Sequence, residues 1–349
     1  MSTIDDVRER LTEVRPAGLN RDIVAAGLVR EIGLDHGVVS LQLHPGPLPP
    51  PIVEATITDI RRAVGALDGV TRVDVQVTRG AAEAEKIALE GIGDIIAVSS
   101  TKGGVGKSTV AVNLAAALSG LGQRVGILDA DIYGPSLPTM LGLSGRPQVA
   151  ETKVFPLERH GLRVMSMGFF LDDSSPVIWR GPLVTGLLRQ FLKDVQWGEL
   201  DVLVVDLPPG TGDAPLTLVQ QVPLAGGVVV TTPQDVSVID VERGIAMFNQ
   251  VNTPVLGIVE NMSAYICPHC GTRDELFGSG GGARLAQQFG VPVLGRIPIV
   301  AAVRESGDAG TPIVIGQPDH PVSRIYVAMA EQVLDRVAAE RAPTPRIIG

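Results

Sequence analysis

The sequence predicts a two-domain protein whose larger part is a doubly wound α/β domain with a mostly parallel sheet. Beyond Asp94, short runs of Val, Ile and Leu recur between helical stretches, as in IIAVSS, RVGILDAD, DVLVVDLP and GGVVVTTP. Continuous apolar strands of this kind are typical of a parallel sheet that helices cover on both faces. A chain of 349 residues that is 45% hydrophobic can bury one large core and a smaller one.

The first 88 residues predict the smaller domain, which is also α/β. An apparent helix precedes the strand VVSLQLH, a proline-rich turn, the helical segment ATITDIRRAVGAL and the strand VTRVDVQVT. The next stretch, RGAAEAEKIALEGIG, is typical of a helix or linker. We therefore expect domains at residues 1–88 and 89–349, with one amphipathic helix over residues 321–342 at the end.

Composition disfavours several classes of function. Lys and Arg total 29 against 38 Asp and Glu, a formal charge of −9, so a general attraction to nucleic acid or anionic lipid is not expected. The start, MSTIDDVRER, lacks the basic residues and apolar run of a secretory signal. No apolar stretch reaches the roughly 20 residues of a membrane-spanning helix. We expect a soluble, cytoplasmic protein that binds neither nucleic acid nor membrane.

The segment IIAVSSTKGGVGKSTVAVNLAAAL joins a strand, a glycine-rich loop and an Ala-rich helix in the order of a phosphate-binding loop. Backbone N–H groups of such a loop, with the helix N-terminus, bind a pyrophosphate. Lys107 is expected to neutralise the β and γ oxygens, and Ser108 to bind Mg²⁺. The nucleotide-binding residues expected here are Gly103, Gly104, Val105, Gly106, Lys107, Ser108 and Thr109.

The loop departs from the strict pattern at Thr101, where glycine is usual, and it carries a second lysine, Lys102. In this it resembles the deviant Walker A group, which includes nitrogenase iron protein, partition ATPases and septum-site ATPases. The resemblance implies a homodimer in which Lys102 reaches the partner's nucleotide and adds positive charge at the transition state. The alternative is a solvated Lys102 without that role.

Two further strands end in aspartates. RVGILDADIYGPS places Asp129 and Asp131 at the end of one strand, and DVLVVDLPPGTGD places Asp206 at the end of another. Such strand ends are where parallel sheets bind ligands. By resemblance, Asp131 orients the attacking water, so the expected catalytic residues are Lys102, Lys107 and Asp131, while Asp129 holds the loop or the Mg²⁺ shell. Asp206 would bind Mg²⁺ through water and the Gly210 N–H would sense the γ-phosphate; the alternative is aspartates that only cap turns.

PVLGIVENMS places Asn261 just after a strand, where its amide can pair with the adenine edge. Guanine-specific P-loop proteins use N-K-x-D, and Met262 and Ala264 fill those positions here, so ATP is favoured over GTP. The resemblance also suggests that the loop near Pro298 covers the base. The alternative is a proline that merely ends a strand.

The two cysteines, Cys267 and Cys270, form a C-x-x-C motif close to Asn261. In a cytosolic chain this spacing favours metal or redox chemistry over a structural disulfide. A redox dithiol would need a thioredoxin-like context that the chain lacks. Zinc would need two more ligands, and zinc bridging two subunits remains an alternative. A dimer would bring together the four thiolates that a [4Fe–4S] cluster uses.

Together, the segments KGGVGKST, DADIYGPS, VIWRGPL, DLPPGTGD and ENMSAYICPHC resemble the Mrp/NBP35 (ApbC-like) iron–sulfur carrier ATPases over about residues 90–340. The resemblance implies that a homodimer hydrolyses ATP and transfers a cluster to apo-proteins. The alternatives are a partition- or septum-type positioning ATPase and a zinc-bridged, nucleotide-dependent scaffold.

The N-terminal unit resembles a MIP18-like domain. Arg15, Pro16 and Ala17 replace its acidic D-P-E, and the turn LHPGPLPPP lacks its cysteine. These departures favour a docking or regulatory role for this unit over metal binding.

Overall fold

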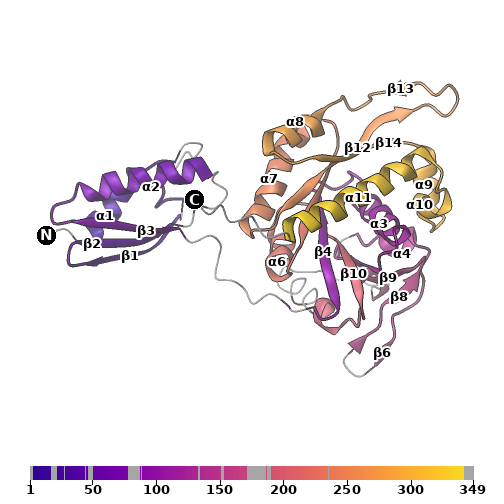
Figure 1. Cartoon of the computed structure of the whole chain (residues 1–349), viewed down its shortest axis with the longest axis horizontal. Coiled ribbons are helices and arrows are strands. Elements are labelled where there is room, and N and C mark those ends of the chain that lie inside the picture. Colours follow the sequence, from indigo (N-terminus) through magenta and orange to yellow (C-terminus); the bar gives the residue numbers. More distant parts are fainter. Residues whose placement is uncertain are drawn as a thin grey trace. The chain divides into compact units, whose positions relative to one another are not determined.

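The computed structural model describes residues 3–16, 22–26, 28–43, 45, 50–77, 87, 89–132, 134–150, 153–170, 186, 190–234 and 236–341. The chain folds into two compact units, Met1–Ala84 and Glu85–Gly349 (Figure 1). The boundary predicted after residue 88 falls beside this division. Most of the linker predicted before it, along with Ala17 and most of the proline-rich turn, lies outside the described residues.

The N-terminal unit packs helices on a three-stranded sheet. Its elements are α1 (Ile4–Leu11), β1 (Val29–Asp35), β2 (Val38–Leu43), α2 (Pro50–Gly65) and β3 (Arg72–Val77). Strand β2 lies between β1, which is antiparallel to it, and β3, which is parallel. The buried residues Val39, Leu41 and Leu43 alternate along β2, so one face of the sheet packs against the core.

Strand β1 was missed by the sequence analysis. It joins β2 through His36 and Gly37, which both have left-handed backbones, with φ of 46° and 81°. Turns of this kind match the twist of paired antiparallel strands, and Asn-Gly or Asp-Gly is their usual signal. His-Gly is not among these usual pairs, so the sequence carries no clear sign of the hairpin.

The larger unit contains β4 (Ile92–Ser99), α3 (Lys107–Gly120), β5 (Val125–Asp129), α4 (Leu137–Met140), β6 (Val149–Ala150), β7 (Lys153–Val154), β8 (Leu157–Arg159), β9 (Leu162–Ser166), η1 (Met167–Phe169), β10 (Leu200–Asp206), α6 (Asp213–Gln221), β11 (Gly226–Thr231), α7 (Val236–Gln250), β12 (Val255–Ile266), β13 (Arg273–Asp274), α8 (Gly281–Phe289), β14 (Val293–Ile299), α9 (Ala301–Asp308), α10 (Ile313–Gly316) and α11 (Pro321–Arg341). The helix predicted at the end of the chain is thus confirmed as α11.

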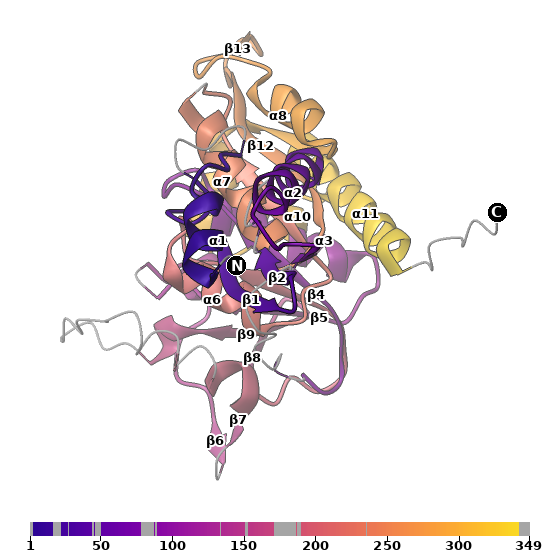
Figure 2. The ribbon, with the colours of Figure 1, turned by 90° about the vertical axis from the view of Figure 1, so that its left-hand side faces the viewer.

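Within the described residues, nine strands form one sheet in the order β13-β12-β11-β4-β10-β5-β9-β8, with β14 also beside β12. The pairings are parallel except those of β13 and β8 at the ends. Helices α3 and α11 lie on one face of the sheet, and α6 and α7 lie on the other (Figures 1 and 2). This arrangement confirms the predicted doubly wound, mostly parallel architecture.

The register of the central strands aligns three polar residues at one edge of the sheet. Asp206 of β10 pairs with Val98 of β4 on one side and with Asp129 of β5 on the other. Asp129 in turn pairs with Ser166 of β9. All three residues are fully buried. The carboxyl edge of the sheet therefore carries a row of buried polar groups where β4 runs into the glycine-rich loop.

The core explains why α3 shows no polar face. Its residues from Val110 to Leu118 are buried, because α3 lies between the sheet and helix α11.

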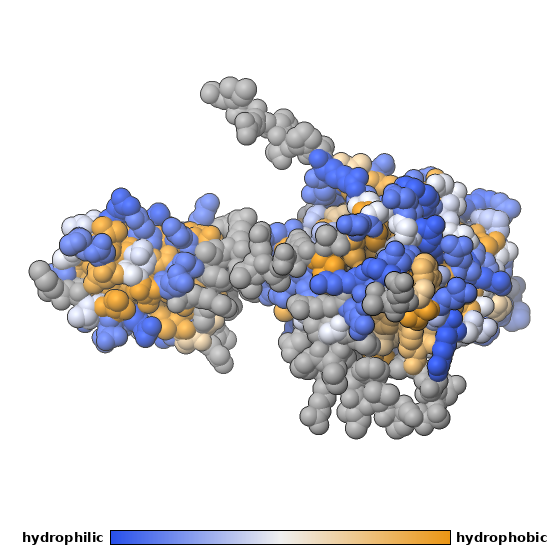
Figure 3. Space-filling view, turned by 90° about the horizontal axis from the view of Figure 1, so that it is seen from below, coloured by the Kyte–Doolittle hydropathy of each residue, from blue (hydrophilic) through white to orange (hydrophobic). Residues whose placement is uncertain are grey.

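Among the described residues, no helix combines the length and the apolar composition that a membrane span requires. On the face seen in Figure 3, hydrophilic and apolar residues are mixed on both units.

The contact between β11 and α7 predicts a stability effect. A Cβ added at Gly227 would lie 2.5 to 2.7 Å from ring atoms of the buried Phe248. We expect Gly227→Ala to lower the free energy of unfolding of the larger unit by about 1–3 kcal/mol through overpacking. Urea unfolding followed by tryptophan fluorescence measures this, because both tryptophans belong to this unit.

Gly120→Ala is the matched control. A Cβ at Gly120, the last residue of α3, meets nothing within 4 Å. This variant should be unchanged or more stable by about 0.5–1 kcal/mol, because alanine restricts the unfolded chain. If Gly227→Ala were as stable as Gly120→Ala, the tight packing of β11 against Phe248 would be contradicted.

Candidate functional site

The phosphate-binding loop (P-loop, residues 100–106) connects β4 to α3. Gly104 and Gly106 have φ of 80° and 81°, a conformation that residues with a Cβ rarely adopt. Gly106 caps the N-terminus of α3, and no side chain bonds to the first helical N–H groups. These groups are therefore available to an anion, which the helix dipole also favours at this end.

Lys107 is the first residue of α3, and its side chain turns into the protein. Its Nζ donates a hydrogen bond to Asp206 Oδ1 at 2.6 Å and lies 3.9 Å from Asp131 Oδ2. Its side chain is 6% exposed and that of Asp206 is fully buried. The Ser108 Oγ lies 3.4 Å from the same ammonium. The fold thus gathers one cation, two carboxylates and a hydroxyl at the carboxyl edge of the sheet.

The two carboxylates keep free coordinating atoms. Asp206 Oδ2 and Asp131 Oδ1 are buried and have no hydrogen-bond partner. Burial raises the pKa of Asp206 above its ordinary value, and the positive charge of Lys107 opposes that rise. Carboxylate and hydroxyl oxygens are the ligands that Mg²⁺ accepts in nucleotide sites. The orphaned oxygens, with Ser108 beside them, therefore fit a magnesium ion.

Asp129 holds the segment that follows β5. Its Oδ1 accepts the N–H of Asp131 at 3.1 Å, and its Oδ2 accepts the N–H groups of Ser136 and Leu137 at 3.1 and 3.2 Å. The Ser166 hydroxyl donates to the same Oδ2 at 3.0 Å. Ser166 was missed by the sequence analysis, because only the pairing of β5 with β9 places it beside Asp129. Asp129 therefore positions Asp131 beside Lys107.

The segment after β10 and the start of the P-loop are joined directly. The Gly210 N–H donates to Ser100 O at 2.8 Å, and Gly210 has a φ of 100°. The Ser100 hydroxyl donates to Lys102 O at 2.9 Å, and Lys102 is partly buried. To donate to a γ-phosphate, as predicted, the Gly210 N–H must first leave the Ser100 carbonyl.

Thr109, the last predicted nucleotide-binding residue, lies in the first turn of α3. Its backbone carbonyl accepts the side-chain amide of Asn113 at 2.9 Å.

Asn261 contacts the P-loop from β12. It is 8% exposed, and its Nδ2 donates to Val105 O at 2.8 Å. A Cβ at Gly106 would lie 2.2 Å from that nitrogen, so only glycine fits there. Pro298 lies near the end of β14, next to Ile297, which pairs with Asn261. The predicted adenine-facing roles of Asn261 and Pro298 stay predictions.

The cysteines lie on a short hairpin at one end of β12, which we call the thiol hairpin (Tyr265–Asp274). Tyr265 and Ile266 pair with β13, and the Cys267 N–H donates to Thr272 O at 2.9 Å. Cys267 is partly buried, Cys270 is exposed, and both are free thiols. Figure 1 shows the hairpin extending from the edge of the sheet.

The hairpin favours a thiolate at Cys270. Its Sγ lies 3.1 Å from Thr272 Oγ1. This hydroxyl, with the Thr272 backbone and the Cys267 thiol, lowers the pKa of Cys270. Thiolates are the form of cysteine that binds metals. Thr272 was missed because a threonine two positions after a cysteine is no signal on its own. In the described part of the chain, no group of three or more His, Cys, Asp or Glu side chains could hold a metal.

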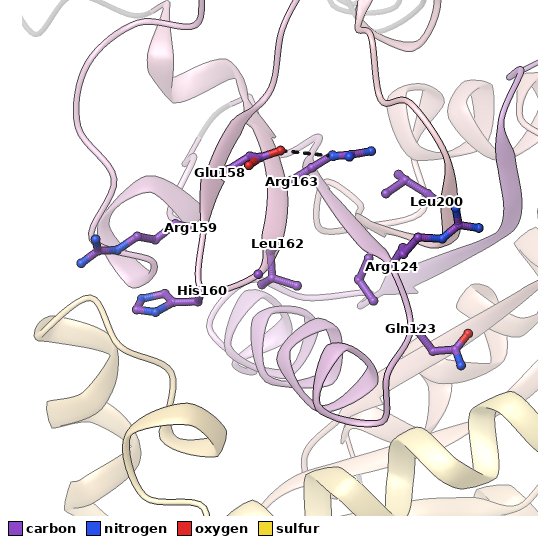
Figure 4. A pocket seen from close by; sticks show the side chains of 10 residues that line it. Gln123, Arg124, Glu158, Arg159, His160, Leu162, Arg163 and Leu200 are labelled. Carbon is purple, nitrogen blue, oxygen red and sulfur yellow. Dashed lines mark hydrogen bonds and ion pairs between the residues drawn. The ribbon is translucent and has the colours of Figure 1, made fainter.

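A separate pocket of 380 Å³ lies at the opposite edge of the sheet, at the amino ends of β5, β9 and β10. Two of the arginines that line it pair with carboxylates: Arg124 with Asp201 at 2.7 Å, and Arg163 with Glu158 at 3.3 Å, a pair that Figure 4 shows. His160 Nε2 lies 2.9 Å from Gly310 O. We therefore interpret this pocket as a structural junction and not as the nucleotide site.

The buried position of Asp129 beside Asp206 predicts that the stability of the fold depends on pH. Burial and the charge of Asp206 raise its pKa from 3.8 to about 7, although hydrogen bonds from Leu137, Ser166 and Asp131 oppose the rise. Because the folded state holds this proton more tightly, its contribution to stability is complete below about pH 4 and is lost as pH rises through about 7. As pH rises from about 4 to about 7, the free energy of unfolding of the native chain should therefore fall relative to that of Asp129→Asn.

Urea unfolding at several pH values, followed by tryptophan fluorescence, measures this difference. Its slope should approach but not exceed about 1.4 kcal/mol per pH unit. Asp201→Asn is the control, because Arg124 lowers the pKa of Asp201 to about 2. That group is ionised in both states above about pH 5, so the control should run parallel to the native chain. Parallel profiles for Asp129→Asn as well would contradict a raised pKa at Asp129.

Comparisons with known proteins agree with this geometry. The family model described as NUBPL iron-transfer P-loop NTPase matches residues 91–334, and that of an iron-sulfur cluster assembly protein matches residues 4–77. An iron-sulfur cluster carrier protein of Synechocystis is 46% identical over 348 residues, which cover 97% of this chain and 99% of the relative.

Two solved structures are also similar. A nucleotide-binding protein of Archaeoglobus fulgidus, in complex with ADP, has a TM-score of 0.58 and 46% identity, covering 64% of this chain and 88% of its own. The cell division ATPase MinD of Pyrococcus furiosus, with a TM-score of 0.52 and 22% identity over 70% of this chain and 99% of its own, shares the fold. With the P-loop, the carboxylate row and the thiol hairpin in place, the chain belongs to the family of NUBPL iron-transfer P-loop NTPases.

Proposed function

We propose that this chain is a cytoplasmic homodimer that binds and hydrolyses ATP and carries a [4Fe–4S] cluster to apo-proteins. The observation that carries the proposal is that one strand, β12, contacts the P-loop through Asn261 and leads six residues later into Cys267. The carrier protein of Synechocystis and the ADP complex of Archaeoglobus fulgidus support the two halves of the proposal.

The arrangement of Lys107, Asp131 and Asp206 suits phosphoryl transfer. On nucleotide binding, Lys107 would exchange Asp206 for the β and γ oxygens of ATP, while the P-loop N–H groups bind the β-phosphate. Mg²⁺, held by Ser108 and the oxygens of Asp206 or Asp131, would neutralise charge on the phosphates. Asp131, positioned by Asp129, would orient the attacking water. Lys102 would supply its charge to the nucleotide of the partner subunit.

The thiol count calls for two chains. One chain supplies two cysteines, and a [4Fe–4S] cluster uses four thiolates. An isologous dimer that places two thiol hairpins together would provide all four. The exposed position of Cys270 suits a cluster that is received and passed on, because its thiol is accessible, and its lowered pKa favours the thiolate form that binds metals.

Nucleotide and cluster would be coupled through two dimer states. ATP can change how tightly the thiols hold the cluster only if it binds one of those states more tightly than the other. Hydrolysis would then reset the dimer. The N-terminal unit, which matches an iron-sulfur cluster assembly domain, would dock or regulate rather than hold the cluster.

Anaerobic reconstitution with iron and sulfide tests the cargo. We expect about four iron and four sulfide per dimer for the native chain, and almost none for Cys267→Ala. His269→Ala, which changes an exposed residue between the two cysteines, is the matched control and should load as the native chain does. Stoichiometric zinc without sulfide would favour the zinc-bridged scaffold. A monomer that takes up no iron would contradict the carrier.

Phosphate release and cluster transfer test the ATPase half. Lys107→Ala should load a cluster but lose nucleotide-dependent transfer to an apo-ferredoxin, because the P-loop cation is missing. Asp131→Ala should bind ATP and reduce phosphate release by a factor of about 10² or more, since removal of a water-orienting group costs this much. Unchanged transfer by Lys107→Ala would exclude the coupling. Nucleotide-dependent sedimentation with DNA or anionic vesicles, without iron uptake, would favour a positioning ATPase.

A further inference from the structure

Strand β12 links the P-loop to the thiol hairpin through its own backbone. The Asn261 Nδ2 donates to Val105 O in the middle of the P-loop. Cys267 begins the turn of the thiol hairpin directly after the strand ends at Ile266. On the other side of Asn261, the buried Glu260 accepts the N–H of Gly282 at the start of α8 at 2.7 Å. The strand is therefore anchored up to Asn261.

The bond from Asn261 acts on a peptide of the P-loop, where phosphates would bind. The Val105–Gly106 peptide is trans, so its C=O and N–H point in opposite directions. Asn261 holds the C=O from behind, and this orients the Gly106 N–H away from β12. A phosphate that accepts this N–H polarises the peptide and strengthens the bond to Asn261. Phosphate binding would thus reach β12 through the Val105–Gly106 peptide and its bond to Asn261.

The regular backbone conformation and pairing of β12 are interrupted directly after Asn261. Met262 has a left-handed φ of 56°, which is unusual for a long side chain. The pairing with β14 passes from Asn261 opposite Ile297 to Tyr265 opposite Ile299, so four residues of β12 advance against two of β14. Such bulges bend a strand and redirect the side chains beyond them. The segment Met262–Ala264 is therefore a joint between the anchored strand and the thiol hairpin.

We propose that Asn261 is a positioning residue that transmits the state of the P-loop to Cys267 and Cys270, with the bulge Met262–Ala264 as the joint. This inference rests on the proposed function, because it supplies the path for the coupling of nucleotide to cluster. It assigns no role in the chemistry to Asn261. By reciprocity, cluster binding at the hairpin alters nucleotide affinity through the same bond.

Thiol alkylation of the full-length, reduced, metal-free chain tests the path. The alkylation rates of Cys267 and Cys270 by iodoacetamide are followed by mass spectrometry, with and without Mg·ADP or a non-hydrolysable ATP analogue at saturation for each variant. In the native chain, nucleotide should change the rate by about fivefold or more, the lower end of measured couplings. In Asn261→Ala and in Met262→Gly, this nucleotide effect should fall to less than about twofold.

Asn252→Gly is the matched control for Met262→Gly. Asn252 has the same left-handed conformation, φ 54°, and lies in the exposed turn just before β12, at the end away from the hairpin. Both variants place glycine at a left-handed position, so a purely structural role of that conformation would make them behave alike. The inference requires that Asn252→Gly keep the native response and that Met262→Gly lose it.

Several outcomes would overturn the inference. One is a native response in Asn261→Ala, including the case in which that variant only changes the preference for ATP over GTP and so marks an adenine contact. Another is a native chain that loads a cluster while its thiols ignore nucleotide, which would leave the carrier function standing. Conversely, thiols that respond through Asn261 in a chain that takes up no iron would support the path and contradict the carrier.

Discussion

The buried ion pair between Lys107 and Asp206 is the interaction around which the site is organised. Both side chains are buried, and Lys107 Nζ lies 2.6 Å from Asp206 Oδ1. Removing one partner of such a pair leaves an uncompensated buried charge, which typically costs about 3–5 kcal/mol. The pair can exist because β10 lies between β4 and β5, so that Asp206 ends beside the loop that carries Lys107. The same burial leaves two carboxylate oxygens without partners.

Hydrogen bonds from β10, from the segment that follows it and from β12 hold the P-loop and the start of α3 in place. Lys107 is held by β10, Ser100 O by the N–H of Gly210, and Val105 O by Asn261 of β12. Each of these bonds involves a group at which a bound nucleotide would act, directly or through one peptide. Binding must therefore displace or strengthen them, and elements far apart in sequence respond to one event. This is the physical basis on which a nucleotide could control a site that it does not touch.

The thiol hairpin and the P-loop require opposite degrees of exposure to solvent. The loop and its aspartates require a dry, rigid environment, because charge interactions weaken in water. A cluster that is handed to other proteins requires thiols at the surface. Strand β12 meets both demands by running from the core, where Val259 is fully buried, to the exposed turn at Cys270. The bulge at Met262 marks the change from one environment to the other.

Much of the fold follows from local chemistry. The apolar strands, the glycine-rich loop, the aspartates at strand ends and the C-x-x-C motif are short segments whose roles depend on residue types at fixed spacing, so each was predicted in its place. Strand β1 was missed because its His-Gly turn is not the usual hairpin signal. This error concerns a backbone conformation that the neighbouring strand stabilises.

The sequence by itself determined that this chain has a P-loop, carboxylates to accompany it and one pair of thiols in a C-x-x-C motif. Only the tertiary structure decided that Asp129 holds the segment carrying Asp131, that Ser166 and Thr272 support the carboxylate and the thiol, and that Asn261 bonds to Val105 across 156 positions. The reason is that motif chemistry is encoded by residues close in sequence. Hydrogen bonds between distant segments depend instead on strand order and register, which the whole sheet sets by burying its apolar faces.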